Sequence, residues 1–433
     1  MITQEDLVVS TLGECRIRSP LPMSTMLGDG VGNFVPDDMR LLYDICLPAG
    51  QSPADLAFEL AGPREQLFFD PPQTRAAIVT CGGLCPGINN IIRTLFFDLT
   101  VNYGIHEILG IRFGYQGLNP QAGTPPIVLT GRMVEDIHHL GGTILGTSRG
   151  SQDVRLMVDF LDQVQVDILF CVGGDGTQRG AHEIAAEIGR RKLPIAVLGL
   201  PKTIDNDIKF CSRTFGFATA VAEADTVIDR AHTEANGVLN GVGLVKLMGR
   251  EAGFIAAAAT IASGHVNFTL IPEVPFKLDG SDGLLAKLER RLAARQHAVI
   301  VVAEGAGQDL IPEHKEAYDA SGNRLLADVG AFLKKRIAEH FGQRDLPVNV
   351  RYFDPSYFIR SCPANTDDSL LCERLARNAA HAAMAGKTDL LIGLWHDEFV
   401  HVPLGMNAGQ KKHLSPEDEV WSMVLAMTGQ EKW

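Results

Sequence analysis

A glycine-rich segment, Gly173-Gly174-Asp175-Gly176-Thr177, follows the apolar run 166–172 and carries residue types that bind phosphate chains. An apolar run that ends in glycines is typical of a buried parallel strand that opens onto a ligand at its carboxyl end. Glycines let backbone N–H groups approach phosphate oxygens where any Cβ atom would collide. Asp175 among them is placed to hold a phosphate-bridging Mg²⁺ ion. The segment therefore predicts a phosphate site.

A second segment, Pro201-Lys202-Thr203-Ile204-Asp205-Asn206-Asp207, follows the apolar run 194–200. Thr203, Asp205 and Asp207 place three hard-oxygen side chains within five residues. One of these groups could accept a proton from a substrate hydroxyl while the others orient it. Together the two segments predict a phosphoryl-transfer site.

Each segment alone has other interpretations. Gly-Gly-Asp-Gly-Thr fits a plain turn, and it is also similar to sequences of NAD kinases and lipid kinases. The Asp-Asn-Asp stretch fits a capped loop as well as a catalytic one. Because both segments stand at the ends of successive expected strands, we favour a shared catalytic role.

Two further glycine turns are suited to anions. Gly82-Gly83 and Pro86-Gly87 precede a helical stretch from Ile88, whose amino end adds a favourable dipole of about half a charge. The segment 141–150 presents Arg149 next to Gly150, and the planar donor fork of arginine suits phosphate.

The elements that must position these turns follow a strand, turn and helix alternation from residue 75 onward. This pattern predicts an α/β fold of two doubly wound, Rossmann-like domains with mainly parallel sheets, plus an N-terminal extension. Strands are expected at 76–80, 107–113, 166–172, 194–200, 241–247, 268–272, 298–303, 348–353 and 389–394, and helices include 178–190, 215–235 and 252–263. In the extension, 36–47 and 53–61 are helical candidates.

Composition narrows the class of protein. The 433 residues are 45% hydrophobic and 21% charged, which is ordinary for an α/β enzyme of two or three domains. The net charge of −13 argues against nucleic acid or an anionic membrane as a partner. No apolar run reaches the roughly 20 residues of a membrane span, and the acidic start lacks a signal-peptide pattern, so we expect a cytoplasmic protein. The eight scattered cysteines are expected to be reduced core thiols.

Several separated motifs together resemble the 6-phosphofructokinase family over roughly residues 75–400. The matching motifs, in order, are Gly82-Gly83 with Pro86-Gly87-x-Asn89-Asn90, Gly-Gly-Asp-Gly-Thr, Thr203 to Asp207, Met248-Gly249-Arg250, Pro272-Glu273 and Glu304. The fragments 243–250 and 357–360 are most similar to the branch that holds plant and kinetoplastid ATP-dependent enzymes and pyrophosphate users.

The resemblance implies roles for individual residues. Asp205 would be the general base for the sugar 1-hydroxyl beside Thr203, Arg250 would contact the transferring phosphoryl group, and Asp175 would hold Mg²⁺. The donor nucleotide would contact Gly83, Arg149, Gly150, Gly174, Asp175, Gly176 and Thr177. Fructose 6-phosphate would contact Thr203, Ile204, Asp205, Met248, Gly249, Arg250, Glu304, Tyr357, Phe358, Ile359 and Arg360, with Arg351 reaching its 6-phosphate across a subunit boundary.

The phosphoryl donor depends on two positions. In the family, a glycine after the metal-binding aspartate leaves room for the α-phosphate of ATP, and an aspartate there excludes it, so Gly176 favours ATP. Lys202 is typical of pyrophosphate users, whose leaving group it can stabilise, but ATP-dependent members of the same branch also carry it. A donor must first fit sterically, and Gly176 leaves room for the α-phosphate of ATP. We therefore expect ATP as the donor, with pyrophosphate as the alternative.

The resemblance also implies a domain plan and an assembly. We expect an extension at 1–72, a donor-binding domain at 73–216, a fructose 6-phosphate-binding domain at 217–359 and a C-terminal segment, 360–433, that returns to the first domain. A homo-oligomer, dimer or tetramer, is expected.

Arg93 is kept where bacterial enzymes bind effectors, but Phe97 replaces a basic residue. A non-catalytic sensor is disfavoured because Asp175 and Asp205 are both present.

Overall fold

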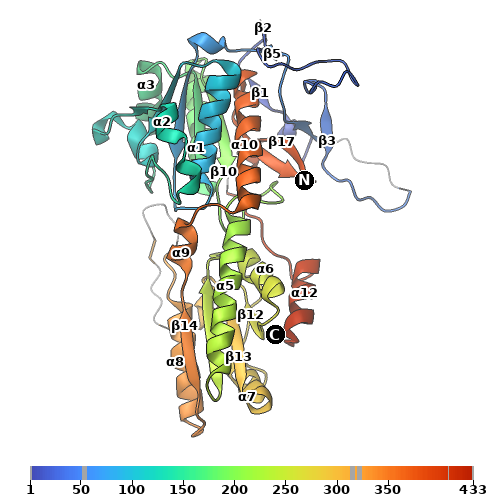
Figure 1. Cartoon of the computed structure of the whole chain (residues 1–433), viewed down its shortest axis with the longest axis vertical. Coiled ribbons are helices and arrows are strands. Elements are labelled where there is room, and N and C mark those ends of the chain that lie inside the picture. Colours follow the sequence, from blue (N-terminus) through green and yellow to red (C-terminus); the bar gives the residue numbers. More distant parts are fainter. Residues whose placement is uncertain (1, 51–55, 313–316, 319–323, 408, 432–433) are drawn as a thin grey trace. The chain divides into compact units, whose positions relative to one another are not determined.

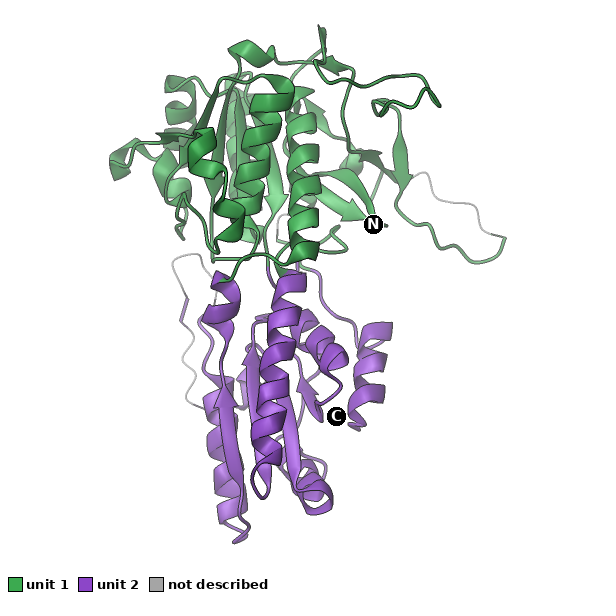
Figure 2. Cartoon of the chain, viewed as in Figure 1, with its two compact units in different colours: residues 1–203, 208–216, 362–411 green, residues 204–207, 217–361, 412–433 purple. Residues whose placement is uncertain are grey.

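The computed structural model describes residues 2–50, 56–312, 317–318, 324–407 and 409–431 (Figure 1). The chain divides into two compact units, which Figure 2 colours separately. Unit 1 comprises residues 1–203, 208–216 and 362–411, and unit 2 comprises residues 204–207, 217–361 and 412–433. The chain therefore passes between the units within the Thr203 to Asp207 motif.

A nine-stranded sheet forms the centre of unit 1. In order across the sheet, its strands are β3 (Arg40–Leu42), β4 (Ala57–Leu60), β17 (Glu398–Pro403), β16 (Leu390–Trp395), β10 (Ala196–Pro201), β9 (Ile168–Gly173), β6 (Arg75–Thr80), β7 (Glu107–Ile111) and β8 (Ile127–Val128). The pairings from β16 to β7 are parallel, and those toward both edges are antiparallel. Every residue of β9 and β10 is buried, as expected for central parallel strands covered on both faces.

Helices cover both faces of this sheet. The long helices of unit 1 are α1 (Ile88–Phe97), α3 (Val154–Gln163), α4 (Asp175–Arg191) and α10 (Thr366–Met384), with α2 (Gly131–Val134) and α11 (Leu404–Asn407) as short turns. α3 and α4 share one apolar core with β6, β9 and β10. α1 and α10 pack against each other, as Figure 1 also shows, and α10 contacts β10 and β16. The doubly wound arrangement predicted for this part of the chain is confirmed.

Unit 2 is built on a smaller, fully parallel sheet. Its strand order is β12 (Phe268–Leu270), β13 (His297–Ala303), β11 (Gly241–Leu247) and β14 (Asn349–Phe353). Its helices are α5 (Phe217–Asn236), α6 (Phe254–Ser263), α7 (Leu284–Arg295), α8 (Val329–Gly342), α9 (Ser356–Ser361) and α12 (Glu419–Thr428). α7 and α8 share a core with Val242 and Leu244 of β11. α5 lies close to the same strand because Gly243 has no side chain, since a Cβ there would stand 2.7 Å from the Ala231 carbonyl oxygen.

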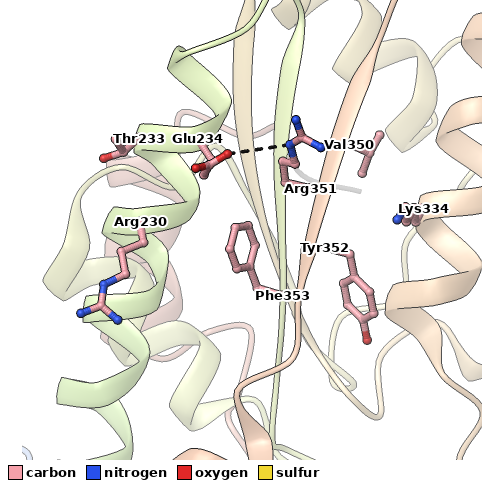
Figure 3. Close-up of a pocket in the computed structure, with 8 residues that line it drawn as sticks. All are labelled: Arg230, Thr233, Glu234, Lys334, Val350, Arg351, Tyr352 and Phe353. Carbon is pink, nitrogen blue, oxygen red and sulfur yellow. Dashed lines mark ion pairs between the residues drawn. The ribbon is translucent and has the colours of Figure 1, made fainter.

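An open cavity of about 730 Å³ runs along the edge strand β14 of unit 2 (Figure 3). It is lined by Arg230, Thr233 and Glu234 from α5, Lys334 from α8 and residues 350–353 from β14. Arg351 projects from β14 toward Glu234, and the two side chains form an ion pair with 3.8 Å between Nε and Oε2.

The N-terminal extension differs from expectation, because its helical candidates are strands. β3 lies within 36–47 and β4 within 53–61, where residues 51–55 are outside the described part of the chain. β4 pairs with β17 and so extends the large sheet. Phe58 is fully buried and its ring packs with those of Tyr43, Phe210 and Trp395. Pairing with a distant strand and burial of these rings outweigh local helical tendency here. Two further strands of the extension form short antiparallel pairs: β1 (Ser10–Thr11) pairs with β15 (Lys387–Thr388), and β2 (Ile17–Arg18) pairs with β5 (Gln66–Leu67).

The strand and helix positions predicted from residue 75 onward agree with the structure. Each expected strand overlaps a strand of one of the two main sheets, and the expected helices 178–190, 215–235 and 252–263 correspond to α4, α5 and α6. The C-terminal segment differs from the expected plan: residues 362–411 belong to unit 1, but residues 412–433 belong to unit 2, where α12 packs on α6. Among the helices of the described residues, none has the length and apolar character needed to cross a bilayer.

Candidate phosphoryl-transfer site

The glycine-rich turn of unit 1 lies between the end of β9 and the start of α4, as the sequence predicts. A Cβ atom on Gly173 would stand 2.1 Å from the Thr177 hydroxyl oxygen, so only glycine fits there. A Cβ atom on Gly176 would meet no neighbouring atom of the described residues within 4 Å. The first turn of α4 therefore borders open space at Gly176, while its Thr177 is buried against the strand end.

Buried hydrogen bonds hold this turn beside the end of β10. The Gln178 side-chain amide donates to the carbonyl oxygens of Gly173 at 2.8 Å and Leu200 at 3.0 Å. The Lys202 backbone N–H also donates to the Gly173 carbonyl at 3.0 Å. The two chemistry-bearing segments thus meet at one sheet edge. Gln178 was not predicted, because an interior glutamine leaves no pattern that separates it from a surface one.

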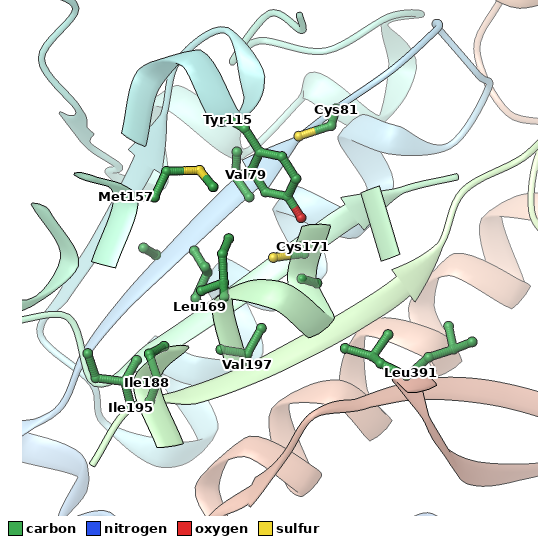
Figure 4. Packing of buried hydrophobic residues seen from close by; sticks show 14 of the residues in the cluster. Val79, Cys81, Tyr115, Met157, Leu169, Cys171, Ile188, Ile195, Val197 and Leu391 are labelled. Carbon is green, nitrogen blue, oxygen red and sulfur yellow. The ribbon is translucent and has the colours of Figure 1, made fainter. Parts of the chain in front are cut away.

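A buried tyrosine supports the turn from behind. The Tyr115 hydroxyl donates to the Thr177 carbonyl oxygen at 2.7 Å, and Figure 4 shows its ring among Val79, Cys81 and Cys171. Burial raises the pKa of Tyr115 well above its ordinary value, so the hydroxyl stays a neutral donor. The Thr177 carbonyl is therefore held by a buried, neutral hydrogen-bond donor.

The loop that follows β6 joins the same place through Lys202. This lysine is only 6% exposed, and its Nζ atom donates to the Gly83 carbonyl oxygen at 2.8 Å. The Thr147 hydroxyl donates to the Gly82 carbonyl at 2.6 Å, and a Cβ atom on Gly83 would stand 3.7 Å from an Arg149 nitrogen. Two positive side chains therefore lie against one glycine pair. The predicted donor residues Gly83, Arg149, Gly150, Gly174, Asp175, Gly176 and Thr177 all belong to these adjoining turns of unit 1.

Asp175, the predicted metal ligand, is a partly exposed carboxylate at the amino end of α4. Its Oδ2 atom accepts from Arg179 Nη2 at 2.8 Å, and its Oδ1 atom accepts from the Gly409 N–H at 3.3 Å. No cluster of three or more His, Cys, Asp or Glu side chains with metal-ligand geometry occurs in the described parts of the chain. A single carboxylate still fits Mg²⁺, which is often held by one or two carboxylates plus substrate phosphates. Arg179 was not predicted, although its i+4 spacing from Asp175 was a usable signal.

In unit 2, the turns after β11 and β13 are locked together. The Glu304 N–H donates to the Leu247 carbonyl at 2.9 Å, and the Gly305 N–H donates to the Gly249 carbonyl at 3.0 Å. Gly249 has a φ of +123°, and a Cβ atom on Gly305 would stand 1.8 Å from the Arg250 carbonyl oxygen. Both glycines are required by this close approach. Met248 is fully buried, so it supports the turn from inside.

The short helix α9 brings an arginine to the same turns. Arg360 Nη2 lies 3.8 Å from Glu304 Oε1, an atom that is buried and has no hydrogen-bond partner among the described residues. Tyr357 and Phe358 on this helix are each 81% exposed, whereas Ile359 is buried. Glu304, Arg250 and α9 therefore present polar and aromatic groups at the carboxyl end of the smaller sheet. The Arg250 guanidinium also donates to the Arg324 carbonyl.

The motif that joins the units has a specific local structure. The Thr203 carbonyl accepts from the Thr214 hydroxyl at 2.7 Å within unit 1. Ile204 is buried, Asp205 is half-buried, and Asn206 has a φ of +57°, which turns the chain sharply. The Asp207 carbonyl accepts from the Lys412 N–H at 2.9 Å within unit 2. Asp205 thus follows Lys202 and Thr203 of unit 1 in the sequence, whereas its own segment, 204–207, belongs to unit 2.

Arg351 is the one predicted site residue that stands away from the others in its own unit. It pairs across the sheet with Gly243, four strand positions before the end of β11. At a rise of about 3.3 Å per residue, this places Arg351 roughly 13 Å along the sheet from the end of β11, after which the Met248 to Arg250 turn begins. Its side chain is 49% exposed and faces the cavity of Figure 3.

Comparisons with known proteins identify the family of this chain. A model of the phosphofructokinase family, described as "Phosphofructokinase", matches residues 75–383. A Borreliella burgdorferi protein named ATP-dependent 6-phosphofructokinase is 45% identical, covering 98% of this chain and 97% of its own. An Arabidopsis thaliana protein named ATP-dependent 6-phosphofructokinase 7 is 46% identical, over 87% of this chain and 78% of its own. This chain belongs to the phosphofructokinase family.

A solved structure shares the fold. The pyrophosphate-dependent phosphofructokinase of Marinobacter aquaeolei superposes with a TM-score of 0.67, over 83% of this chain and 92% of its own, at 19% identity. This likeness supports the α/β architecture and, at such low identity, carries no information about the donor.

Proposed function

We propose that this protein is an ATP-dependent 6-phosphofructokinase, which transfers the γ-phosphoryl group of ATP to the 1-hydroxyl of fructose 6-phosphate. The observation that carries the proposal is the donor turn, where Gly176 borders open space beside Asp175 in the first turn of α4. The relatives named above, at 45% and 46% identity, support the same assignment. Fructose 1,6-bisphosphate and ADP are the products.

The reaction is a substitution at the γ-phosphorus. The oxygen of the sugar 1-hydroxyl forms a bond to phosphorus while the bond to the β,γ-bridging oxygen breaks, and the hydroxyl proton passes to the Asp205 carboxylate. Thr203 orients Asp205, and Arg250 stabilises charge on the transferring group. Lys202 lies at the Gly83 carbonyl, where its ammonium stabilises negative charge on the donor phosphates. Positioning and charge stabilisation supply most of the catalysis in such reactions.

Asp175 is the residue that would hold Mg²⁺, with donor phosphate oxygens completing its ligands. When bound, the ion neutralises phosphate charge. Arg179, which pairs with Asp175 in the structure, would have to release one carboxylate oxygen.

Pyrophosphate is the competing donor, and Lys202 is the observation that favours it. Its buried ammonium would suit a pyrophosphate leaving group as well as ADP. Gly176 favours ATP, because among the described residues no neighbouring atom lies within 4 Å of the position of a Cβ atom there, which leaves room for an α-phosphate. We therefore assign ATP.

The sugar phosphate would contact Glu304, Arg250, Tyr357 and Arg360 of unit 2. Met248, Ile204 and Ile359 are buried and would contribute through backbone and packing. Arg351 would serve the 6-phosphate site of a neighbouring copy, in a homo-oligomer that is a dimer or tetramer. We place the reaction in the cytoplasm.

The assignment is tested by incubating the purified protein with ATP, Mg²⁺ and one sugar phosphate at a time. ADP release that depends on fructose 6-phosphate, with fructose 1,6-bisphosphate as product, is expected. ADP release that is equal with fructose 6-phosphate, glucose 6-phosphate and no sugar would contradict it.

Replacing Asp175 with asparagine should raise the Mg²⁺ concentration needed for half-maximal activity, because a neutral amide is a poorer ligand for a hard cation. Activity is measured across a Mg²⁺ series at saturating ATP. Asp159→Asn is the matched control, since Asp159 is also a carboxylate of unit 1 paired with an arginine, Arg191. An Asp175→Asn profile that matches the control would remove Asp175 from the metal site.

Truncating Arg360 or Arg351 to alanine should raise KM for fructose 6-phosphate more than KM for ATP, because hydrogen bonds to charged groups contribute about 1.5–3 kcal/mol. Arg344→Ala is the control, since Arg344 is 47% exposed, close to the 49% of Arg351, and is also paired with a glutamate, Glu289. If Arg351 acts across a subunit boundary, mixing Arg351→Ala with Asp205→Ser protomers should restore part of the activity. No restoration would mean that each site is complete within one chain.

A further inference from the structure

Lys246 of unit 2 has contacts that the proposed reaction does not use. Lys246 is on β11, one residue before the strand ends at Leu247. Side chains along a strand alternate between its two faces, so Lys246 is on the same face as Val242 and Leu244, which pack in the apolar core beneath α7 and α8. Only 13% of its side chain is exposed. A lysine at this position needs a specific reason, because burying an ammonium is costly unless it is paired.

Two carboxylates neutralise this ammonium. Lys246 Nζ lies 2.8 Å from Asp354 Oδ2 and 3.3 Å from Asp328 Oδ1. Burial by itself disfavours the charged form, but the hydrogen bond to Asp354 and its negative charge raise the pKa of Lys246 above its ordinary value. The pKa of Asp354 is lowered by the same contact in spite of its own burial. The group is therefore ionised across the physiological pH range.

Each of the two aspartates also accepts hydrogen bonds at the start of a helix. Asp328 accepts from the Ala331 N–H at 3.1 Å as the cap of α8. Asp354 Oδ1 accepts from the Ser356 N–H at 3.2 Å and from the Ser356 hydroxyl at 2.6 Å, at the start of α9. An aspartate in such a position satisfies backbone donors that the helix itself leaves open. Lys246 thus connects the amino ends of α8 and α9 to the central strand.

Tyr352 closes the arrangement. Its hydroxyl donates to Asp328 Oδ1 at 2.8 Å. Its ring lies over Gly330, where a Cβ atom would stand 2.2 Å from the ring. Asp328 is therefore held from two sides, and Asp354 is the link that reaches α9.

α9 carries the groups assigned above to the sugar phosphate. It is only six residues long, so the position of its start also sets the position of Tyr357 and Arg360. Arg360 lies 3.8 Å from Glu304, and it has little other fixed support among the contacts of the described residues. A displacement of the order of 1 Å at such groups weakens their contacts with a substrate and can lower a rate by about 10²-fold.

We propose that Lys246 is a positioning residue for the sugar-phosphate site: by holding Asp354, it fixes α9 and so aims Tyr357 and Arg360 at fructose 6-phosphate. This inference rests on the proposed function. Lys246 itself would touch no substrate, yet its replacement would weaken the binding of fructose 6-phosphate and not that of ATP.

The test compares Lys246→Met with wild type in steady-state kinetics. Methionine keeps the length of the side chain and its apolar packing but removes the charge. KM for fructose 6-phosphate should rise about tenfold to a hundredfold, the effect of losing a hydrogen bond to a charged group, while KM for ATP changes little. Lys335→Met is the matched control, because Lys335 is a 76% exposed lysine of α8 whose only ion pair in the described structure is with Glu339 at 3.9 Å. The control should behave as wild type.

A second variant covers the case in which Lys246→Met folds poorly. Asp354→Asn keeps the oxygen that caps α9 and removes the charge that faces Lys246. It should raise the same KM selectively, and the double variant should be no worse than the more affected single one, because both remove one interaction. Unchanged KM for fructose 6-phosphate in a folded variant would overturn the proposal. Equal rises in both KM values for Lys246→Met and Asp354→Asn would also overturn it.

Hydrogen–deuterium exchange separates this inference from the proposed function. Exchange of residues 356–361 should be faster in Lys246→Met than in wild type and Lys335→Met, whether or not fructose 6-phosphate is the substrate. If wild type does not phosphorylate fructose 6-phosphate but this exchange difference is present, the proposed function fails and the fixing of α9 by Lys246 stands. If wild type is active and the exchange is unchanged, the positioning role fails alone.

Discussion

Replacing Asp205 with serine lowers kcat by about 10²- to 10⁴-fold and leaves the affinity for fructose 6-phosphate nearly unchanged, if Asp205 is the general base. Serine is too weak a base at neutral pH to take the proton of the 1-hydroxyl, while phosphate and hydroxyl contacts elsewhere in unit 2 remain. The variant is measured by steady-state kinetics, and sugar-phosphate binding is measured by calorimetry.

Asp279→Ser serves as the control for this variant. Asp279 is a 65% exposed carboxylate of unit 2 that pairs with Arg336, so its loss removes the same group from a surface position. Near-normal kcat in Asp205→Ser would remove Asp205 from the role of base. A parallel loss of sugar-phosphate affinity would indicate a binding role instead.

Gly176→Asp should abolish most activity with ATP. The new side chain would occupy the space in which we place the α-phosphate, and a like-charge contact of carboxylate and phosphate costs roughly several kcal/mol where solvent is scarce. In the structure, a Cβ atom at this position meets nothing within 4 Å, so the variant should fold normally and the effect should come from the nucleotide alone. Lys202 would then allow weak activity with pyrophosphate.

Gly189→Asp is a close control for that substitution. Gly189 is on the same helix, α4, and a Cβ atom there also meets nothing within 4 Å. The control should keep the ATP activity of wild type. Comparable loss in both variants would show that aspartate harms the helix, and would withdraw the steric argument for ATP.

The central strands and the donor turns could be predicted from sequence because their causes are local. Runs such as 166–172 and 194–200 are apolar throughout, as strands covered on both faces must be, and glycine turns follow them directly. Parallel strands bring their carboxyl ends to one edge of a sheet, so Gly173 to Thr177 and Lys202 had to be neighbours. The structure agrees, since the Lys202 N–H donates to the Gly173 carbonyl.

The parts that were missed depend on contacts between distant residues. β17 follows β16 through a two-residue turn, His396-Asp397, with φ values of +50° and +65°. These residues lack the Asn-Gly signal that usually marks such a hairpin. Without β17, the strand β4 has no visible partner in the sequence, and its segment was interpreted as helical.

The ion pairs of Lys246 also could not be predicted from the sequence. Asp328 and Asp354 are 82 and 108 residues away from it, and a lone lysine near a strand end is most simply interpreted as a surface residue. Arg179 was also overlooked, because the functional motif was expected to end at Thr177.

The most direct test of the proposed reaction and its donor is a parallel measurement of kcat/KM for ATP and for pyrophosphate, with wild-type protein, Mg²⁺ and saturating fructose 6-phosphate. We predict efficient turnover with ATP and barely detectable turnover with pyrophosphate. Efficient turnover with pyrophosphate would contradict the assignment of the donor, and no turnover with either would contradict the proposed reaction itself.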